Sequence, residues 1–346
     1  MRTKALVTGG AGYFGDRLCR KLQEQGCDVR IFDVRPPDIT GPGAEVFQGD
    51  IRDRAAIAAA CLGVDVIFHN VAQVPLAKDK RLFWSVNRDG TRNMLQAAAD
   101  AHVKKVIYTS SSAVYGIPES NPVTEETEPH PREDYGKAKL AGEGLCWEFA
   151  QRGLDVSIVR PRTIMGHGRL GIFQILFEWI YQGANIPVLN DGRNVYQFVH
   201  ADDLADAIIR ASRRPGPQAY NCGAARFGTM RETLENLCRV TGTGSKVLSL
   251  PMAPMVAAME ISSRIGVSPL GPYHSMMYGR SMYFNISKAQ RELGWQPAYS
   301  NDEMFVESYE WYLKNRGSTL KKAGGSASHH RSPVKAGALQ VLRWIM

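Results

Sequence analysis

Short apolar segments alternate with amphipathic stretches along the first two thirds of this chain. Residues 4–8 read as a buried strand, and Phe14, Leu18 and Leu22 then recur at the spacing of one helix face. Further strand candidates follow at residues 28–34, 45–49, 64–71, 103–110 and 155–160. Strands that alternate with helices favour parallel pairing, because each helix carries the chain back across the sheet. The pattern therefore predicts an α/β fold with a doubly wound parallel sheet.

The last third of the chain has a different pattern. The stretch PMAPMVAAMEISSRIG, residues 251–266, is mostly apolar and predicts a helix with Met255, Met259 and Ile261 along one side. Methionines adapt to irregular apolar surfaces, so this side fits either the wall of a pocket for a flexible apolar substrate or ordinary core packing. Both interpretations add a smaller, mostly helical C-terminal domain to the sheet.

The positive charge of the chain is concentrated near its C-terminus. The 346 residues carry a net charge of +8. No acidic residue follows Glu310, whereas the basic residues after it are Lys314, Arg316, Lys321, Lys322, Arg331, Lys335 and Arg343. The body of the protein is therefore close to neutral and lacks the basic face that nucleic-acid binding requires. We expect a small-molecule substrate and no nucleic-acid partner.

Residues 314–346 have the composition of a disordered tail that ends in the apolar segment ALQVLRWIM. This tail is either an extension without function or a weak contact to an anionic membrane surface. The strand that begins at residue 4 leaves no room for a signal peptide, and no run of about 18 apolar residues could span a membrane. The six cysteines are scattered, without a C-x-x-C pair or a metal-site spacing. We expect a cytoplasmic protein without a metal, with peripheral membrane contact as the alternative.

Three glycines follow the first strand at a spacing typical of dinucleotide sites. Gly9 permits a tight turn, Gly12 lets the backbone approach a pyrophosphate, and Gly15 lets helix and strand pack closely. The N-terminus of the following helix supplies N–H groups and partial positive charge for the phosphates. Asp33, at the end of the second strand, can bind a ribose 2′-hydroxyl and repel a 2′-phosphate. NAD is therefore expected rather than NADP, although the adjacent Arg35 weakens this preference.

Tyr135 and Lys139 are four residues apart in EDYGKAKLAGE, so they share one face of a helix. A free tyrosine has a pKa near 10, about three units too high for a general base at neutral pH. A neighbouring ammonium stabilises the phenolate and is expected to lower this pKa. The pair alone also fits an ordinary solvated helix face. The glycine turn upstream makes it a candidate for proton transfer beside a nicotinamide.

The order of these motifs resembles that of the extended short-chain dehydrogenase/reductases, within the NAD-dependent epimerase/dehydratase superfamily. The resemblance covers about residues 1–313. It rests on the segments TGGAGYFG, HNVAQV, NRDGTRN, YTSSSAVYG, VRPRTIMG, FVHADDLADA and SKAQRELGWQP, together with the Asp50-Ile51 and Tyr135–Lys139 pairs. It implies a Rossmann-type fold, an NAD cofactor and a homodimer.

The resemblance also implies roles for individual residues. Tyr135 would exchange the proton, Lys139 would lower its pKa and bind the nicotinamide ribose, and Ser111 would orient the reacting oxygen. The implied cofactor contacts are Gly9, Gly12, Tyr13, Phe14, Gly15, Asp33, Asp50, Ile51, Val71, Ala72, Asn87, Tyr135, Lys139 and Pro161. Asn87 would order the backbone of the active site. The neighbouring Ser110 and Ser112 are predicted to cap the end of their strand.

The substrate is harder to predict, because the chain departs from the sugar-nucleotide members of the family. Arg162 and Thr163 lie in a segment where those members have an asparagine that contacts the diphosphate, and Tyr196 replaces an arginine. The long segment 222–287 is similar to the 3β-hydroxysteroid dehydrogenase-like and β-keto-acid reductase-like branch. We expect hydride transfer to or from a hydroxysteroid-like, lipid or β-keto compound. Candidate substrate contacts are Ser112, Thr163, Tyr196 and Arg280.

Two alternatives stay open. Arginines elsewhere could rebuild a diphosphate clamp, which would suit a nucleotide-sugar epimerase that oxidises its substrate transiently with tightly bound NAD. These arginines are Arg162, Arg169, Arg193, Arg226 and Arg280. The protein could also be a catalytically silent NAD-binding scaffold, although such a protein has no need of Ser111, Tyr135 and Lys139. A dehydratase is not expected, because Ser112 and Ala113 replace the usual Asp-Glu pair.

The motifs divide the chain into three predicted regions. Residues 1–162 with 190–222 would form the NAD-binding Rossmann domain. Residues 163–189 with 223–313 would form the substrate-binding domain. Residues 314–346 would form the basic tail.

Overall fold

The computed structural model describes residues 2–37, 44–73, 80–257, 277 and 279–321. Its largest feature is a seven-stranded parallel sheet with the strand order β10-β6-β5-β4-β1-β2-β3. The strands are β1 (Lys4–Thr8), β2 (Asp28–Asp33), β3 (Glu45–Gln48), β4 (Val66–His69), β5 (Lys105–Thr109), β6 (Val156–Pro161) and β10 (Gln218–Cys222). The chain winds outward from β1 to β3 and then crosses back to β4, which makes the sheet doubly wound. The predicted α/β fold of the Rossmann type is confirmed.

The strands follow the apolar runs of the sequence closely. Strands β4, β5 and β6 are buried along their whole length, so they read as continuous apolar runs rather than as alternating ones. The edge strand β3 is mostly exposed. Each predicted strand appears within two residues of its expected ends, whereas β10 was not among the strand candidates.

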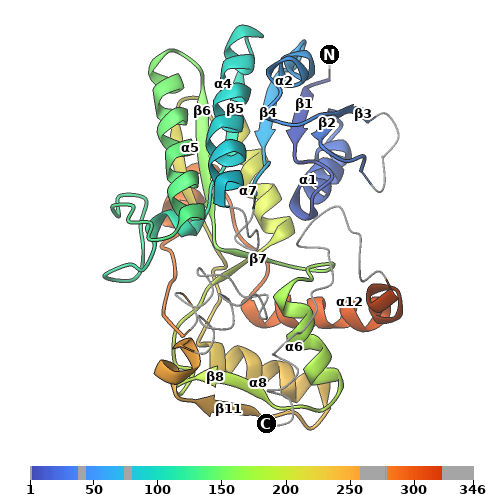
Figure 1. The fold of residues 1–346 in the computed structure, drawn as a ribbon, viewed down its shortest axis with the longest axis vertical. Coiled ribbons are helices and arrows are strands. Elements are labelled where there is room, and N and C mark those ends of the chain that lie inside the picture. The colour runs from blue at the N-terminus through green and yellow to red at the C-terminus, as the bar shows by residue number, and fades with distance from the viewer. Residues whose placement is uncertain (1, 38–43, 74–79, 258–276, 278, 322–346) are drawn as a thin grey trace.

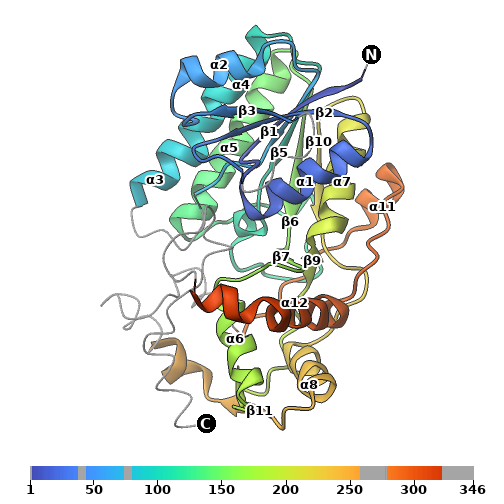
Figure 2. The same cartoon turned by 90° about the vertical axis from the view of Figure 1, so that its right-hand side faces the viewer.

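Helices cover both faces of the sheet (Figures 1 and 2). One face is packed by α1 (Tyr13–Glu24), α7 (Ala201–Arg213) and α11 (Ser287–Leu293), the other by α2 (Arg54–Cys61), α4 (Thr91–Asp100) and α5 (Asp134–Gln151). The short helix α3 (Lys80–Trp84) leads through a π-helical turn, Ser85–Gly90, into α4. Leu18 of α1 and Ile208 of α7 belong to the core of the first layer, and Leu95 of α4 and Phe149 of α5 belong to the core of the second.

A smaller part lies below the sheet in Figure 1 and begins where β6 ends. It contains α6 (Ile172–Tyr181), α8 (Met230–Thr241) and α12 (Asn301–Lys321). Two small parallel sheets accompany these helices: β7 (Thr163–Met165) with β9 (Phe198–His200), and β8 (Ile186–Leu189) with β11 (Val247–Leu250). Its core is aromatic, because Phe177, Phe198, Phe305 and Tyr312 pack in one cluster. A helical C-terminal part was expected, and the small sheets add to it.

The predicted start of the tail at residue 314 is wrong. Helix α12 continues to Lys321, and Thr319 is buried. Arg316 donates from Nη2 to Glu178 Oε1 at 2.7 Å, and Tyr312 donates to Glu178 Oε2 at 2.5 Å. Glu178 lies on α6. Arg316, one of the basic residues on which the tail prediction rested, therefore holds α12 against α6. Residues 322–346 lie outside the described part.

The predicted methionine-rich helix is described only over its first turns. Residues 252–257 are helical, whereas Met259 and Ile261 lie outside the described part of the chain. Among the residues that the structure describes, no helix is both long enough and apolar enough to cross a membrane.

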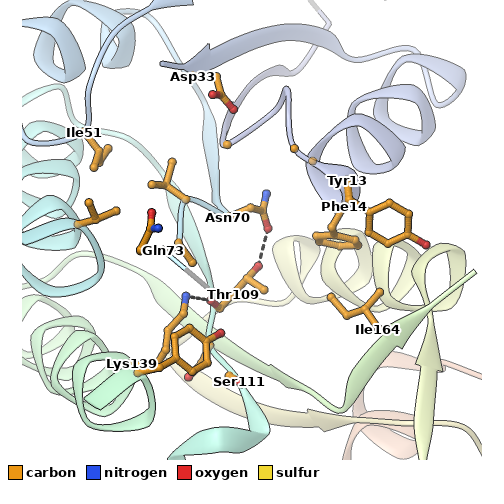
Figure 3. Close-up of a pocket in the computed structure, with 18 of the residues that line it drawn as sticks. Tyr13, Phe14, Asp33, Ile51, Asn70, Gln73, Thr109, Ser111, Lys139 and Ile164 are labelled. Atoms are coloured by element: carbon orange, nitrogen blue, oxygen red, sulfur yellow. Dashed lines mark hydrogen bonds between the residues drawn. The ribbon is translucent and has the colours of Figure 1, made fainter. Parts of the chain in front are cut away.

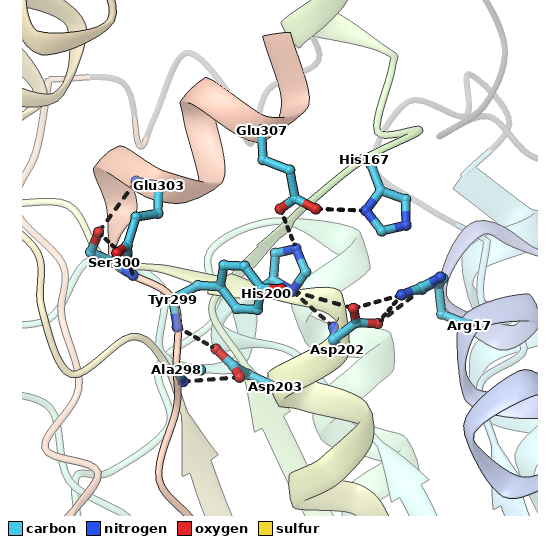
Figure 4. Close-up of polar contacts among 10 residues, drawn as sticks. All are labelled: Arg17, His167, His200, Asp202, Asp203, Ala298, Tyr299, Ser300, Glu303 and Glu307. Carbon is cyan, nitrogen blue, oxygen red and sulfur yellow. Dashed lines mark hydrogen bonds and ion pairs between the residues drawn. The ribbon is translucent and has the colours of Figure 1, made fainter. Parts of the chain in front are cut away.

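A carboxylate on α12 joins the smaller part to the sheet (Figure 4). Glu307 accepts hydrogen bonds from His167 Nδ1 at 2.7 Å and from His200 Nε2 at 2.9 Å. His200 precedes α7, whose Asp202 pairs with Arg17 of α1. Burial alone would raise the pKa of Glu307, but the hydrogen bonds from both histidines outweigh it and lower the pKa to about 2.

The ligand atoms of His167, His200 and Glu307 lie within 4.8 Å of one another, the spacing of a three-ligand metal centre. The tautomer of His200 argues against that use. Its Nδ1 accepts the N–H of Asp202 at 3.2 Å, so a neutral ring carries its proton on Nε2 and cannot ligate a metal through that atom. The three side chains therefore form a hydrogen-bonded clamp.

Replacing Glu307 by glutamine should lower the free energy of unfolding by roughly 1–2 kcal/mol at pH 7, because two hydrogen bonds to a charged group are weakened. The pKa of Glu307 is depressed in the folded state, so its contribution is complete above the ordinary value of 4.5 and is lost as the pH falls toward about 2. Urea unfolding between pH 7 and pH 3 measures this, with Glu310→Gln on the exposed face of the same helix as the control. A difference that does not shrink with falling pH would contradict it.

Candidate active site

The glycine turn after β1 is built so that side chains do not fit. Gly9 has a φ of +72°, in the left-handed region, and its N–H donates to the carbonyl of Phe32 at 2.8 Å. A Cβ atom on Gly15 would lie 2.1 Å from the carbonyl oxygen of Gly9. Gly12 is the N-cap of α1, and within the described residues no side chain caps that end. The open N–H groups of this turn fit a pyrophosphate.

A pocket of about 510 Å³ extends from this turn to α5. Figure 3 shows Asp33 near one end, Lys139 and Ser111 near the other, and Asn70 with Thr109 between them. The predicted residues that line it are Gly9, Gly12, Tyr13, Phe14, Gly15, Asp33, Asp50, Ile51, Val71, Ala72, Ser111, Ser112, Tyr135, Lys139, Pro161 and Thr163. One cavity therefore collects residues from the ends of β1 to β6.

Three predicted site residues do not line this pocket. Asn87 lies behind it and holds the backbone of Gln73, accepting its N–H at 2.7 Å and donating to its carbonyl at 3.0 Å. The hydroxyl of Tyr196 is 3.0 Å from that of Thr163, so this tyrosine supports a lining residue. Arg280 is outside the pocket wall among the described residues, and its predicted contact with substrate has no support from this pocket.

Two carboxylates line the end of the pocket near β2 and β3. Asp33 accepts the N–H of Ala11 at 3.1 Å and the N–H of Arg35 at 3.2 Å, which fixes its orientation beside the glycine turn. Burial raises the pKa of Asp33, and these backbone hydrogen bonds oppose that shift. Asp50 pairs with Arg52 at 2.5 Å. Asp50 is therefore paired with a cationic side chain. Among the described residues, Asp33 accepts hydrogen bonds from backbone N–H groups and from no side-chain cation.

Lys139 is anchored at the opposite end. Its side chain is 2% exposed, and Nζ donates to the carbonyl of Thr109 at 2.8 Å. The Thr109 hydroxyl in turn donates to Asn70 Oδ1 at 2.6 Å, which links β5 to the segment after β4. Burial lowers the pKa of Lys139 to about 8, because the ammonium loses its hydration. The lysine is therefore charged at neutral pH but close to its titration range.

The pKa of Tyr135 is shifted in the direction opposite to the one that the sequence predicts. Burial raises the pKa of its phenol to about 12, the hydrogen bond with Ser111 lowers it in part, and Glu133 raises it again. The helix spacing correctly places Lys139 on the same buried side of α5, but desolvation of the phenolate dominates the shift of the Tyr135 pKa, and Lys139 is not among its causes. The protein's own groups keep Tyr135 protonated at neutral pH.

The serine triplet divides its roles differently from the prediction. Ser111, not its neighbours, caps the 3₁₀ turn that follows β5, accepting the N–H of Ala113 at 3.2 Å. Ser110 donates to Glu143 Oε1 at 2.5 Å, and Ser112 accepts from Arg162 Nη1 at 2.8 Å. The predicted caps at Ser110 and Ser112 are therefore wrong, because both hydroxyls have buried charged partners that are distant in sequence.

Several lining residues were not predicted as site residues. Asn70 immediately precedes the predicted Val71, and Thr109 immediately precedes the serine triplet that contains Ser111. Their position next to these motifs was the available signal. The others are Phe32, Val34, Arg35, Gly49, Arg52, Gln73, Leu82, Val86, Ser110, Arg162, Ile164 and Arg169. Most of these are ordinary apolar or loop positions that carry no motif. The sequence marked Arg169 only as a member of a possible diphosphate clamp, and Arg162 as a member of that clamp and as a departure from the sugar-nucleotide pattern.

Comparisons with known proteins agree with this geometry. The model of the NAD dependent epimerase/dehydratase family matches residues 5–223. The chain belongs to this family. It is 29% identical to a UDP-glucose 4-epimerase of Lactobacillus helveticus, over 89% of this chain and 97% of the relative. It is 30% identical to a 3 beta-hydroxysteroid dehydrogenase/Delta 5-->4-isomerase of Mycobacterium tuberculosis, over 90% of each.

A solved structure has the same overall fold. MoeE5 in complex with UDP-glucuronic acid and NAD superposes with a TM-score of 0.74 at 26% identity, covering 90% of this chain and 99% of MoeE5. The names of the relatives include both branches that the sequence left open, the epimerases and the hydroxysteroid dehydrogenases. Membership of the family therefore establishes the fold and the general class without choosing a reaction.

Proposed function

We propose that this protein is an NAD-dependent oxidoreductase that moves a hydride between the nicotinamide and a secondary alcohol or ketone. The observation that carries this proposal is that Ser111, Tyr135 and Lys139 line the same pocket as the glycine turn and Asp33. Ser111 and Lys139 lie at the opposite end of this pocket from Asp33 (Figure 3). A scaffold that only binds NAD would need the glycine turn, Asp33 and Lys139, but it would have no need of the acid/base chemistry of Ser111 and Tyr135.

Each of the three side chains has a separate task in this proposal. Tyr135 exchanges a proton with the substrate oxygen, and its raised pKa means that the proton to be donated is present at neutral pH. The Ser111 hydroxyl, which lines the same pocket and lowers the pKa of Tyr135, orients that oxygen. Lys139, fixed by the carbonyl of Thr109, binds the ribose next to the nicotinamide. When bound, NAD supplies or accepts the hydride.

We propose NAD rather than NADP because the Asp33 carboxylate lines the pocket beside the glycine turn, where it could accept a hydrogen bond from a ribose 2′-hydroxyl and would repel a 2′-phosphate. Replacing Asp33 by alanine should reduce the ratio of NADH to NADPH affinity by about tenfold, since the repulsion of a 2′-phosphate is removed and a ribose hydrogen bond is lost. Fluorescence titration with both cofactors measures the ratio. Asp28→Ala, an exposed position on the same strand, is the matched control. An unchanged ratio in Asp33→Ala would assign the choice of cofactor elsewhere.

The predicted substrate classes place different demands on the pocket. A sterol needs apolar walls, which Leu82, Val86 and Ile164 would supply. The cationic side chains of Arg162 and Arg169 line the same pocket and suit a polar substrate better. We therefore favour a β-keto compound or a nucleotide sugar over a sterol, with a 4-epimerase reaction as the second candidate. Residues 163–189 and 223–313 are proposed to hold this substrate.

The remaining expectations are proposals of the same kind. A homodimer follows from the resemblance to the family. Contact of residues 322–346 with an anionic membrane surface follows from their composition. Gel filtration tests the first, and co-sedimentation with anionic vesicles of full-length protein and of a chain ending at residue 321 tests the second.

A further inference from the structure

Arg162 is a buried cation in the wall of the pocket. Its side chain is 1% exposed, and it follows β6 directly. Its Nη1 donates to the Ser112 hydroxyl at 2.8 Å and lies 3.3 Å from the thioether of Met282. Within the described part of the chain, Nε and Nη2 have no hydrogen-bond partner. Two of its three nitrogens are therefore buried with unused N–H donors.

The two other arginines that are buried as whole residues, Arg30 and Arg160, are paired with carboxylates, whereas Arg169 shares with Arg162 a buried nitrogen without a hydrogen-bond partner among the described residues. Arg160, two residues earlier, donates from Nε to Glu143 Oε1 at 2.9 Å and from Nη2 to Oε2 at 2.7 Å. Arg30 donates from Nε to Glu45 Oε2 at 2.9 Å. An unpaired buried cation costs several kcal/mol, so such pairs are the rule. Arg162 instead lies over the Tyr196 ring, 4.6 Å from its centroid, which stabilises a cation only in part.

The two unused nitrogens of Arg162 form one side of the guanidinium. Nε–H and the neighbouring Nη2–H point in parallel and make the fork that binds both oxygens of a carboxylate. Arg160 uses the same two nitrogens for Glu143. The ligand that would complete Arg162 is therefore an anion with two acceptor oxygens, which a carboxylate or a phosphate provides.

The anion would lie toward the end of the pocket that holds Ser111 and Lys139, which favours a carboxylate of the substrate over a phosphate of the cofactor. The partner of Arg162, Ser112, follows Ser111, and both serines line the pocket together with Tyr135. The acidic residues among those lining the pocket are Asp33 and Asp50, and both lie at the other end. Arg169 lies over the ring of Tyr13, 5.8 Å from its centroid, at the start of α1. Because Tyr13 is part of the glycine turn and α1, the Arg169 guanidinium suits the cofactor phosphates. Arg162 is then the arginine that suits the substrate.

We propose that Arg162 binds a carboxylate of the substrate, one or two bonds from the carbon that exchanges the hydride. This inference rests on the proposed function for the identity of that carbon, but the anion site itself does not. The substrate is then a keto or hydroxy acid, either a free β-keto acid or a nucleotide-linked uronic acid. A neutral sterol or a neutral sugar would leave the guanidinium unpaired.

Calorimetric titration of the full chain tests this with pairs of ligands that differ in the carboxylate. One pair is UDP-glucuronic acid and UDP-glucose, and the other is 3-oxohexanoate and its methyl ester, each with NADH present. Tyr135→Phe is used as the background so that turnover does not disturb the titration. We expect the acid of one pair to bind at least ten times more tightly than its neutral partner, because charge-assisted bidentate hydrogen bonds are lost without it. The pair that responds identifies the source of the carboxylate.

Arg162→Met keeps the volume and removes the charge, so the ratio of affinities should fall to about one. Arg162→Lys keeps the charge and loses the fork, so the ratio should fall several-fold. NADH binding, followed by fluorescence, reports whether each variant is folded. Equal binding of acid and neutral ligands in both pairs, or a ratio that is unchanged in Arg162→Met and Arg162→Lys, would overturn the proposal. Selective binding of an acid without turnover in the unmodified protein would overturn the proposed oxidoreductase function and leave this site standing.

Discussion

Replacing Tyr135 by phenylalanine should lower turnover by about 10²- to 10⁴-fold and leave the affinity for NADH within about twofold. The substitution removes the proton-exchanging hydroxyl and keeps the ring, which packs edge-on against Phe83 at 6.2 Å between centroids. Tyr135 is buried and lines the pocket. The expected loss therefore belongs to the chemistry and not to the fold. Steady-state measurement of NADH consumption, with binding followed by fluorescence, separates the two.

The matched control is Tyr181→Phe. Tyr181 is 47% exposed at the end of α6 and does not line the pocket, so its substitution should leave both quantities unchanged. Full turnover in Tyr135→Phe would exclude this hydroxyl as the acid. An unmodified protein that binds NADH but turns over neither keto acids nor nucleotide sugars would instead favour the scaffold alternative.

The sheet and the cofactor turn could be predicted because their determinants are local. A buried parallel strand is a short apolar run, and the turn after β1 needs glycine at fixed positions, so both leave a direct trace in the sequence. The spacing of Tyr135 and Lys139 likewise follows from helix geometry. These features depend on residues that are at most a few positions apart.

The features that escaped prediction depend on distant partners. Arg316 pairs with Glu178, 138 positions away, and it lies in α12, where the sequence predicts a tail. Arg162 meets Met282 across 120 positions, and no motif marks the pair. The pKa of Tyr135 is raised, whereas the sequence predicts a lowered one. Burial of the phenol causes this shift, and burial depends on the whole fold, whereas the spacing of Tyr135 and Lys139 depends only on the helix. Side-chain charge and exposure thus had to come from the structure.

Replacing Gly15 by alanine should weaken NADH binding by roughly 10- to 100-fold. The new Cβ would lie 2.1 Å from the carbonyl oxygen of Gly9 and 2.8 Å from Cα of Gly10. Both contacts are with backbone, so no side chain can move aside and the turn must open. Overpacking of this kind costs about 1–3 kcal/mol, which is about one to two powers of ten in affinity if the turn that binds the pyrophosphate carries the strain.

Gly144→Ala in α5 separates this effect from the general effect of adding a methyl group to a helix. Gly144 is exposed, and a Cβ there would meet no atom within 4 Å. The substitution should leave NADH binding unchanged and raise the free energy of unfolding by about 0.5–1 kcal/mol, since alanine favours a helix over glycine. Fluorescence titration and urea unfolding of both variants measure the two quantities. Normal NADH affinity in Gly15→Ala would mean that the close approach of α1 to Gly9 does not shape the dinucleotide site.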